Sequence, residues 1–382
     1  MKLKIVLFFL LNLVTSVVFA NENAAKLDIE QQVKQFMAKE NIPALAVAII
    51  QNRKINFTAG YGVLDRESSS EIDQHTIFQI GSQSKMLTSM IALELVKEGK
   101  LALSDRLVEL LPGVFPEASI AEFQTLTLEH LMVHRSGLPN YPKNVSRIDG
   151  DAFLGGYNKE MLLSALKSIE LSFKPNEKWQ YSNFNYAVLG YVLSQVSNKS
   201  YAELVQYYIS DKYDLSNTVV ALTEQQKTQL ATPYRKDNRA VATQPWDMGL
   251  LAPHGGVYSS INDLAHLMEL QLAAYLEYGQ SGVATPLVST QIKYDTEFTQ
   301  AETIYPGLIY GLGMFEASEE FPMFSSTVLF HGGDLDGFGC EYLFSAEHGV
   351  GVVLLTSSGG REFVSFARKL MEQLLPKPAN KN

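Results

Sequence analysis

Ser82 and Lys85 form the residue pair in this sequence whose types and spacing are best suited to chemistry. They stand three positions apart, directly after Gly81 and at the start of a long apolar segment. Residues three apart on a helix share one face, so the amine would lie beside the hydroxyl. Serine is a weak nucleophile until a neighbour takes its proton, and lysine can do so when burial or nearby charge lowers its pKa. The pair therefore indicates a serine acyl-transfer enzyme that needs no histidine base.

The same Ser-x-x-Lys spacing occurs a second time, at Ser164 and Lys167. This copy lies inside an amphipathic segment, where a solvated polar face explains both residues. Ser82 differs because the preceding Gly81 predicts a turn into a helix. The N–H of a residue at a helix start has no partner within the helix and can bind an oxyanion. The context, rather than the spacing, selects Ser82.

A second candidate element is the aromatic-rich segment 179–186, which contains Tyr181 and Asn183. A tyrosine phenol near a lysine ammonium ionises more easily and can pass protons. An asparagine offers both a donor and an acceptor to a substrate amide. Packing of an aromatic loop on the core is the alternative explanation for this segment.

A third candidate is the run His331-Gly332-Gly333-Asp334, which follows a strand-like segment. Two glycines after the histidine would let a substrate approach the backbone closely. The His-Gly-Gly triplet also occurs at 254–256, in a loop that leads to a helix, where it predicts a structural turn. The 331 copy has strand on both sides, so we prefer it for the site.

Other candidate sites are weaker. His130 and His134 have the i, i+4 spacing of metal ligands, but no glutamate follows His130 and no third ligand is evident, so no metal is expected. No Gly-x-Ser-x-Gly elbow and no phosphate-binding glycine loop occurs. Cys340 is the only cysteine, which excludes an intramolecular disulfide. It lies in an alternating, strand-like segment and is predicted to be a buried, apolar-like thiol.

Hydrophobic periodicity predicts strands near both ends of the chain and helices between them. Predicted strands cover 44–50, 55–62, 310–315, 327–330, 340–344 and 351–356, and predicted helices cover 27–40, 82–99, 159–170, 187–196, 201–209, 262–276 and 361–375. This order favours one sheet built from both termini (about 27–80 and 255–376) and an inserted helical region (about 100–250). The turn-rich segment 139–157 is a candidate rim for the site.

The first twenty residues are typical of a secretory signal peptide. Lys2 and Lys4 precede an apolar run over 5–19, and Val18-Phe19-Ala20 is a small-x-small cleavage site. We expect cleavage after Ala20, one hydrolase domain over 21–382, a periplasmic or secreted location and no stable membrane insertion afterwards. An uncleaved anchor is the alternative, although the run is short for a spanning helix.

The acidic composition argues against some partners. The formal net charge of the 382-residue chain is −10, and loss of Lys2 and Lys4 would lower it to −12. Such a protein is unsuited to nucleic acid or to anionic membrane surfaces. A small-molecule or peptide substrate is the expected partner, and the oligomeric state stays open.

Taken together, the motifs resemble the serine β-lactamase and penicillin-binding-protein superfamily, in its class C branch. The family's order is Ser-x-x-Lys, then Tyr-x-Asn, then His-x-Gly on a late strand, which here are Ser82/Lys85, Tyr181/Asn183 and His331/Gly333. The segment 127–139 resembles the branch's helix-to-loop segment and gives the histidine pair a structural role. The resemblance covers about 28–375.

The resemblance implies an α+β fold, in which an antiparallel sheet is flanked by helices and carries an inserted all-α region, with the site at their junction. Ser82 would be the acyl-forming nucleophile. Lys85 and Tyr181 would share the proton transfers, and which one takes the first proton stays open. Asn183 would orient the substrate amide, and His331 would lie on the sheet edge. The backbone N–H groups of Ser82 and Asp334 would form the oxyanion hole, beside Gly333. No cofactor is implied.

One departure affects the expected substrate. Class C β-lactamases usually have Lys-Thr-Gly at the third motif, whereas His331-Gly332-Gly333 resembles the D,D-peptidase, D-aminopeptidase and esterase members. A fixed positive charge is thereby lost, and Asp334 would repel an anionic substrate if it faced the site. Arg361 is a candidate for a compensating charge, although a solvated arginine at a helix start is the preferred interpretation.

The expected function is that of an exported serine hydrolase that acts through an acyl-serine on a small amide, peptide or ester. A D-Ala-type peptide, a β-lactam and a short ester all stay open as substrates. The alternative is a penicillin-binding or sensor protein that is acylated without efficient turnover.

Overall fold

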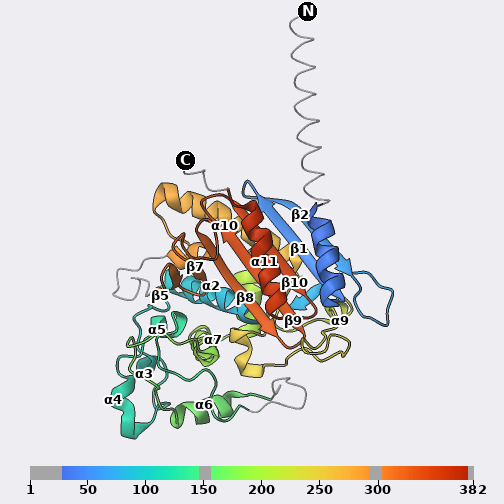
Figure 1. Ribbon diagram of the computed structural model, residues 1–382. Coiled ribbons are helices and arrows are strands. Elements are labelled where there is room, and N and C mark those ends of the chain that lie inside the picture. The colour runs from blue at the N-terminus through green and yellow to red at the C-terminus, as the bar shows by residue number, and fades with distance from the viewer. Residues whose placement is uncertain (1–27, 146–155, 292–302, 377–382) are drawn as a thin grey trace, which may run out of the picture.

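The computed structural model describes residues 28–145, 156–291 and 303–376 (Figure 1). The predicted signal peptide lies outside these residues. Within the described ranges, no helix combines the length and the apolar composition that crossing a membrane requires.

One eight-stranded antiparallel sheet dominates the fold, with the strand order β2-β1-β10-β9-β8-β7-β6-β5. Its strands are β1 (Ala44–Gln51), β2 (Lys54–Gly62), β5 (Thr303–Tyr305), β6 (Leu308–Tyr310), β7 (Phe315–Ala317), β8 (Val328–Leu335), β9 (Phe338–Ser345) and β10 (Val350–Thr356). The pairing of β1 with β10 joins the two ends of the chain, in the register Val47↔Leu354. This arrangement confirms the predicted fold class.

Both faces of the sheet are buried in its centre, which explains why β1 and β10 are almost entirely apolar. Leu45, Val47 and Ile49 of β1 belong to one core cluster, whereas the intervening alanines belong to the other. The alternation follows from the two-residue period of a strand. The sheet therefore needs helices on both faces.

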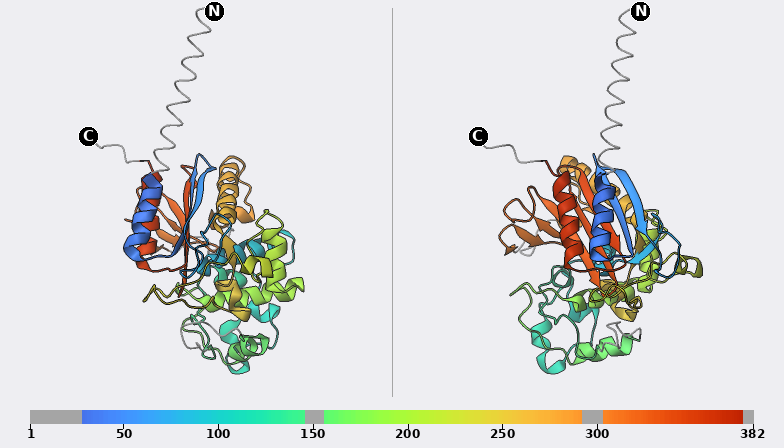
Figure 2. Two further views of the ribbon diagram at one scale, coloured as in Figure 1. Left: turned by 90° about the vertical axis from the view of Figure 1, so that its right-hand side faces the viewer. Right: turned by 45° about the vertical axis from the view of Figure 1, so that its right-hand side comes forward.

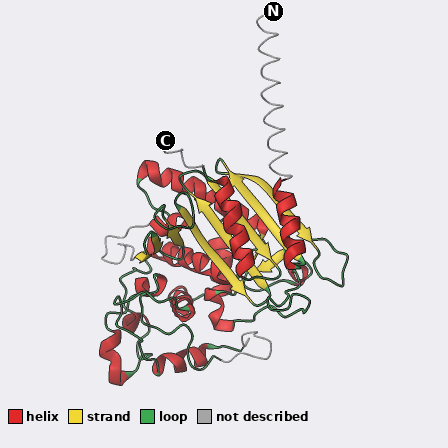
Figure 3. Ribbon diagram, in the orientation of Figure 1, coloured by secondary structure: helices red, strands yellow, loops and turns green. Residues whose placement is uncertain are grey.

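The helices that cover the two faces come from different parts of the chain (Figures 2 and 3). The helix over 28–40 and α11 (Arg361–Leu374) lie together on one face, where the rings of Phe36 and Phe366 stack with centroids 4.3 Å apart. α10 (Ile261–Ser281) covers the other face and contacts β1, β2 and β10. The predicted helices in these positions are present.

Residues between β2 and α10 form the inserted helical region and a small two-stranded sheet; α3 to α7 of this region lie in the lower part of Figure 1, whereas α2 and α9 lie level with the sheet. Its elements are β3 (Ile77–Gln79), η1 (Gly81–Gln83), α2 (Ser84–Lys97), α3 (Leu107–Leu110), η2 (Glu117–Ser119), α4 (Ile120–Phe123), α5 (Leu128–Met132), α6 (Lys159–Lys167), α7 (Asn183–Ser197), α8 (Tyr201–Val205), η3 (Gln206–Ser210), α9 (Glu224–Lys227), η4 (Gly249–His254) and β4 (Tyr258–Ser260).

Helix α2 is buried on every side over its first three turns, from Ser84 to Leu95. A helix that is buried all round lies inside a protein rather than on its surface. It contacts α7 and η4 of the helical region as well as η1, which packs on β8 of the sheet. The residues at its start are therefore held at the junction of the sheet and the helical region.

One strand prediction was wrong. The segment 310–315 was expected to be a single strand, but β6 ends at Tyr310 and β7 begins at Phe315, with a turn between them. Gly313 has φ +94°, and a Cβ there would lie 2.7 Å from Ser89 Oγ, so the chain turns where it packs against α2. As a result β7 is short and pairs with β8 only as far as Phe330.

The pairing of the chain ends predicts a stability effect. Leu354→Ala removes a fully buried side chain at the centre of β10, and we expect it to lower the free energy of unfolding by about 2–5 kcal/mol, because it leaves a cavity. Leu276→Ala is the matched control, since Leu276 is exposed on α10. Denaturant titration checks both. Equal effects of the two variants would contradict the proposed core.

Candidate active site

Ser82 lies in η1, the short 3₁₀ turn that leads into α2. Gly81 enters this turn with φ +55°, a conformation that favours glycine. The first N–H groups of such a turn have no acceptor within it, so the N–H of Ser82 is available to a ligand. The expected turn into a helix is present, although α2 proper begins at Ser84.

The backbone of β8 passes directly beside this turn. A Cβ placed on Gly333 would lie 1.9 Å from Ile80 O and 3.1 Å from the Ser82 nitrogen, so only glycine fits. A Cβ on Gly81 would in turn lie 3.2 Å from the nitrogen of Asp334. The two backbone nitrogens predicted to form an oxyanion hole are thus brought to one place.

Beyond Phe330, β8 pairs with a strand on one side only among the described residues. Its residues His331–Leu335 pair with β9, while the pairing with β7 on the other side stops at Phe330, opposite the first residue of β7. The other edge of this stretch therefore offers backbone groups to an extended ligand, next to Ser82.

The amine of Lys85 is completely buried and makes three contacts from three parts of the chain. Its Nζ lies 3.0 Å from Ser82 Oγ, 2.7 Å from Asn183 Oδ1 and 2.8 Å from the carbonyl oxygen of His254. Burial lowers the pKa of Lys85 well below its usual value of 10.5, because the charged form loses its hydration.

These contacts suit a neutral amine. Asn183 Oδ1 and His254 O only accept hydrogen bonds, so they take both N–H groups of a neutral amine. The remaining lone pair then faces Ser82 Oγ, where it can receive the hydroxyl proton. The orientation of the Asn183 amide is supported by its Nδ2, which donates to Asn140 Oδ1 at 3.0 Å.

Tyr181 lies beside the same pair. Its ring centroid is 4.8 Å from Lys85 Nζ, and its phenol is close enough to the Ser82 side chain for that hydroxyl to influence its pKa. The expectation that Tyr181 ionises easily was wrong, because burial raises the pKa of its phenol, and the interaction with Ser82 offsets only part of that rise. A neutral Tyr181 can relay a proton, whereas the lowered pKa of Lys85 makes the amine the better first base.

The Tyr181–Asn183 segment is fixed by the start of α7. Ser182 is the N-cap of this helix, and its hydroxyl accepts from the N–H of Asn185 at 3.1 Å. The N–H of Ser182 donates to His134 Nδ1 at 3.2 Å, and the His134 ring lies against the Tyr181 ring. His134 therefore positions the segment, and among the described residues no cluster of metal-binding side chains occurs.

His331 is buried and neutral at the sheet edge. Its Nδ1 donates to the carbonyl oxygen of Gly332 at 2.7 Å, which leaves Nε2 as an acceptor with no hydrogen-bond partner among the described residues. Burial and the nearby Lys85 lower the pKa of His331 to about 3. The residue thus offers polarity but no positive charge to a substrate.

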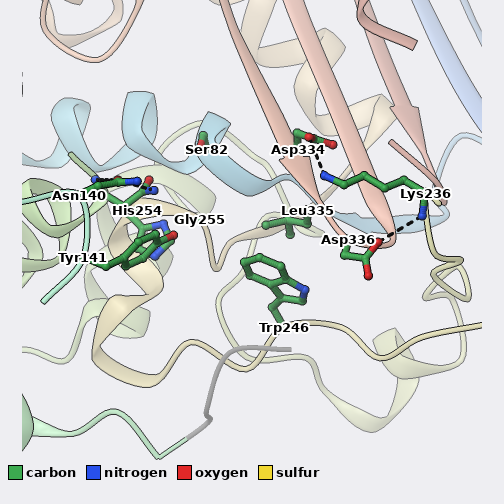
Figure 4. A pocket seen from close by; sticks show the side chains of 11 residues that line it. Ser82, Asn140, Tyr141, Lys236, Trp246, His254, Gly255, Asp334, Leu335 and Asp336 are labelled. Atoms are coloured by element: carbon green, nitrogen blue, oxygen red, sulfur yellow. Dashed lines mark hydrogen bonds and ion pairs between the residues drawn. The ribbon is translucent and has the colours of Figure 1, made fainter. Parts of the chain in front are cut away.

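Two pockets meet at Ser82 and Asp334. The first, of about 280 Å³, is shown in Figure 4 and is here called the acidic pocket. The second, of about 300 Å³, is here called the arginine pocket. The acidic pocket is lined by Ser82, Asn140, Tyr141, Asn183, Lys236, Trp246, His254, Gly255, Asp334, Leu335 and Asp336. The arginine pocket is lined by Ser82, Tyr181, Phe315, Phe330, His331, Gly332, Gly333, Asp334, Glu341, Val364 and Arg368.

Several site residues were missed or misjudged at the level of sequence. His254 was predicted to belong to a structural turn, but it lines the acidic pocket, and its carbonyl binds Lys85. Asp334 was expected to repel an anionic substrate if it faced the site; it lines both pockets, but its carboxylate pairs with Lys236 Nζ at 2.9 Å. Arg361 is exposed at the start of α11, in agreement with the preferred interpretation of a solvated arginine, whereas Arg368, two turns later, was missed and lines the arginine pocket.

The remaining candidates lie away from Ser82. Ser164 and Lys167 are exposed on α6, and Ser164 borders a separate pocket that Ser82 does not line. Cys340 is fully buried in β9, and burial raises the pKa of its thiol. Within the expected rim 139–157, Asn140 and Tyr141 line the acidic pocket, and residues 146–155 lie outside the described residues.

The family model for β-lactamases matches residues 29–375. The chain belongs to the β-lactamase family. It is similar to the protein flp of Staphylococcus aureus strain MW2, with 25% identity over 92% of this chain, but it spans only 66% of the length of that relative. A β-lactamase of Pseudomonas fluorescens is 27% identical over 64% of this chain and 64% of its own length.

Two solved structures have the same fold. A β-lactamase/D-alanine carboxypeptidase from Pseudomonas syringae matches with a TM-score of 0.76 and 20% identity, over 92% of this chain and all of that one. An octameric penicillin-binding protein homologue from Pyrococcus abyssi matches with a TM-score of 0.73 and 21% identity, over 91% of this chain and 76% of that one.

The environment of Lys85 predicts how Ser82 responds to pH. The rate at which a fluorophosphonate labels Ser82 should rise as the pH rises past the lowered pKa of Lys85. Below that pKa the amine is protonated and cannot accept the Ser82 proton, so labelling should be slow. Lys85→Met should lower the labelling rate by about 10²–10⁴-fold. The control is Lys167→Met, in the second Ser-x-x-Lys pair. Labelling that persists in Lys85→Met would rule out the amine as the base.

Proposed function

We propose that this protein is an exported serine hydrolase that acts through an acyl-serine intermediate on a small amide, peptide or ester. Family membership supports the reaction class. The observation that carries the proposal is the contact of Lys85 Nζ with Ser82 Oγ, at 3.0 Å and inside a buried site. Export rests on the signal peptide predicted over residues 1–20.

The contacts around Ser82 support a two-stage reaction. Lys85 takes the hydroxyl proton while Ser82 Oγ attacks the substrate carbonyl, and the N–H groups of Ser82 and Asp334 stabilise the resulting oxyanion. The C–N or C–O bond to the leaving group then breaks, and the leaving group receives the proton through Tyr181. In the second stage water attacks the acyl-serine, gives up its proton to the same groups and restores the Ser82 hydroxyl.

The arginine pocket supports a substrate that bears a carboxylate beyond the scissile bond. Arg368 is its one cation among the described lining residues, because His331 is neutral. Burial raises the pKa of Glu341, the acid beside it, to about 8, so this carboxyl is mostly uncharged near neutral pH. A D-Ala-type peptide and a β-lactam both carry such a carboxylate, whereas a short ester does not.

The first test is the nucleophile itself. Ser82→Ala should lower turnover of 4-nitrophenyl esters and D-Ala-D-Ala peptides by at least about 10³-fold and abolish covalent labelling by a fluorescent penicillin, since Ser82 Oγ is the atom that forms the acyl bond. Ser164→Ala, the matched control, should change neither, and intact mass follows the label over time.

The lifetime of the covalent label distinguishes a hydrolase from a penicillin-binding or sensor protein. Clearance of the adduct within minutes supports a hydrolase, and a label that persists supports a penicillin-binding protein or sensor. Loss of labelling in Ser164→Ala alone would show that the wrong serine had been chosen.

A second test concerns the leaving-group side. Arg368→Gln should reduce kcat/KM for carboxylate-bearing D-Ala-D-Ala peptides by about tenfold or more and leave neutral 4-nitrophenyl esters nearly unchanged, because only the former need the guanidinium. Arg361→Gln, on the same helix but exposed, is the control. An equal loss on both substrates in Arg368→Gln would refute the role in carboxylate binding.

A further inference from the structure

Glu341 places a carboxyl group in the wall of the arginine pocket. The residue is 5% exposed and lies within β9. Leu343, two positions later, shares a core cluster with Phe363 of α11, so the Glu341 side chain also faces that helix. Among the described residues no hydrogen bond reaches this carboxyl, and its oxygens are not fully enclosed either. The carboxyl is therefore accessible from the pocket that it lines.

The glycine opposite Glu341 makes room for this carboxyl. Gly332 of β8 pairs with Glu341, and a Cβ on Gly332 would lie 2.5 Å from Glu341 Oε1 and 3.4 Å from Oε2. Any side chain at that position would displace the carboxyl. The next residue, Gly333, contacts the Ser82 turn. The carboxyl thus lies over β8 beside the residue that meets the nucleophile's turn.

Arg368 lines the same pocket from α11, which passes over β9 and β10 (Figure 1). The charge of Arg368 acts on Glu341, but no hydrogen bond or salt bridge joins the two groups among the described residues. A guanidinium and a carboxyl that share a pocket without bonding leave room for a ligand between them. A carboxylate fits this room chemically, because it has two oxygens that each accept hydrogen bonds.

The charges near Glu341 leave its carboxyl mostly protonated at neutral pH. Burial raises the pKa of Glu341 to about 8; the charge of Arg368 opposes this rise, and the Asp334 carboxylate adds to it. Asp334 is itself paired with Lys236. A protonated carboxyl donates a hydrogen bond, whereas an ionised one only accepts. Glu341 can therefore act as a donor beside the guanidinium.

The other groups that surround Glu341 carry no charge in the same pH range. The pKa of His331 is lowered to about 3, so its ring is neutral, and burial raises the pKa of Tyr181, so its phenol keeps its proton. The partner of Glu341 on β10 is Leu354. The charged residues of α11 other than Arg368 are exposed: Arg361, Glu362, Lys369 and Glu372.

We propose that the protonated carboxyl of Glu341 donates a hydrogen bond to the carboxylate of the substrate, while the Arg368 guanidinium binds the other oxygen of that carboxylate. The substrate thus bridges two protein groups that do not bond to each other. An ionised Glu341 has no proton to donate, repels the carboxylate and competes for Arg368. The inference rests on the proposed function, because it takes the arginine pocket as the place of the leaving-group carboxylate.

The first test compares N-acetyl-D-Ala-D-Ala with its C-terminal amide, which lacks only the carboxylate. The ratio of their kcat/KM values should fall by about tenfold or more between about pH 7 and about pH 9.5, because Glu341 loses its proton in this range. Titration of Lys85 affects both peptides and cancels in the ratio. Glu341→Gln should keep the preference for the acid but lose its pH dependence, since an amide donates at every pH.

Glu362→Gln is the matched control, because Glu362 is exposed on α11. It should show the same fall in the ratio as the unmodified protein. A ratio that stays constant with pH, or that falls equally in Glu341→Gln, overturns the inference.

A second measurement needs neither turnover nor a variant of Glu341. In calorimetry of the Ser82→Ala protein at about pH 9, binding of the acid peptide should take up about one proton, because free Glu341 is largely ionised there. The uptake appears as a dependence of the binding heat on the ionisation enthalpy of the buffer. The amide peptide should bind without proton uptake.

The two measurements together separate this inference from the proposed function. Binding of the acid peptide without proton uptake, or no tighter than that of the amide at about pH 7, overturns the inference, and Ser82-dependent hydrolysis would then leave the hydrolase proposal standing. Proton-linked binding of the acid peptide by a protein that hydrolyses neither peptides nor esters would support the carboxylate site and overturn the hydrolase proposal.

Discussion

The burial of the Lys85 amine is the constraint on which the rest of the site depends. A fully buried ammonium without a carboxylate partner is unfavourable, so the fold must hold the amine in its neutral form and satisfy both of its N–H groups. It does so with Asn183, from the start of α7, and with the His254 carbonyl, from η4. The one lone pair that remains is directed at Ser82.

The surrounding elements can be understood as supports for that arrangement. The hydroxyl of Thr88 donates to the carbonyl oxygen of Pro253 at 2.7 Å, and the N–H of Val257 donates to Ser84 Oγ at 3.2 Å. Both bonds tie the loop that carries the His254 carbonyl to α2. On the other side, Gly333 lets β8 approach the Ser82 turn closely enough for backbone groups of both to act together. The nucleophile is thus fixed by packing before any substrate arrives.

Much of this could be predicted from sequence because the signals are local. The apolar runs of β1 and β10 and the glycine before Ser82 each specify their own element. The order of strands and helices followed from such signals, whereas the roles of the three motif pairs followed from their resemblance to a known family. The prediction of a single strand over 310–315 was wrong because contact with Ser89 of α2 imposes a turn there, and no local sequence pattern indicates that contact.

The parts that sequence could not supply depend on tertiary packing. His254 contributes a backbone carbonyl, which has no residue signature, and Arg368 is distinguished from Arg361 only by the face of α11 that reaches the pocket. The direction of the pKa shift of Tyr181 also depended on burial, which outweighed the interaction of the phenol with Ser82.

The charge state of Lys85 is the central claim, and it can be measured directly. NMR titration of protein labelled with ¹³C at lysine Cε, with the Lys85 signal assigned by its loss in Lys85→Arg, reports the pKa of that one amine. We predict a titration well below the usual value of 10.5, with the amine largely neutral in the pH range in which Ser82 reacts. A Lys85 amine that stays charged up to its usual pKa would contradict the account, because it could not accept the proton of Ser82.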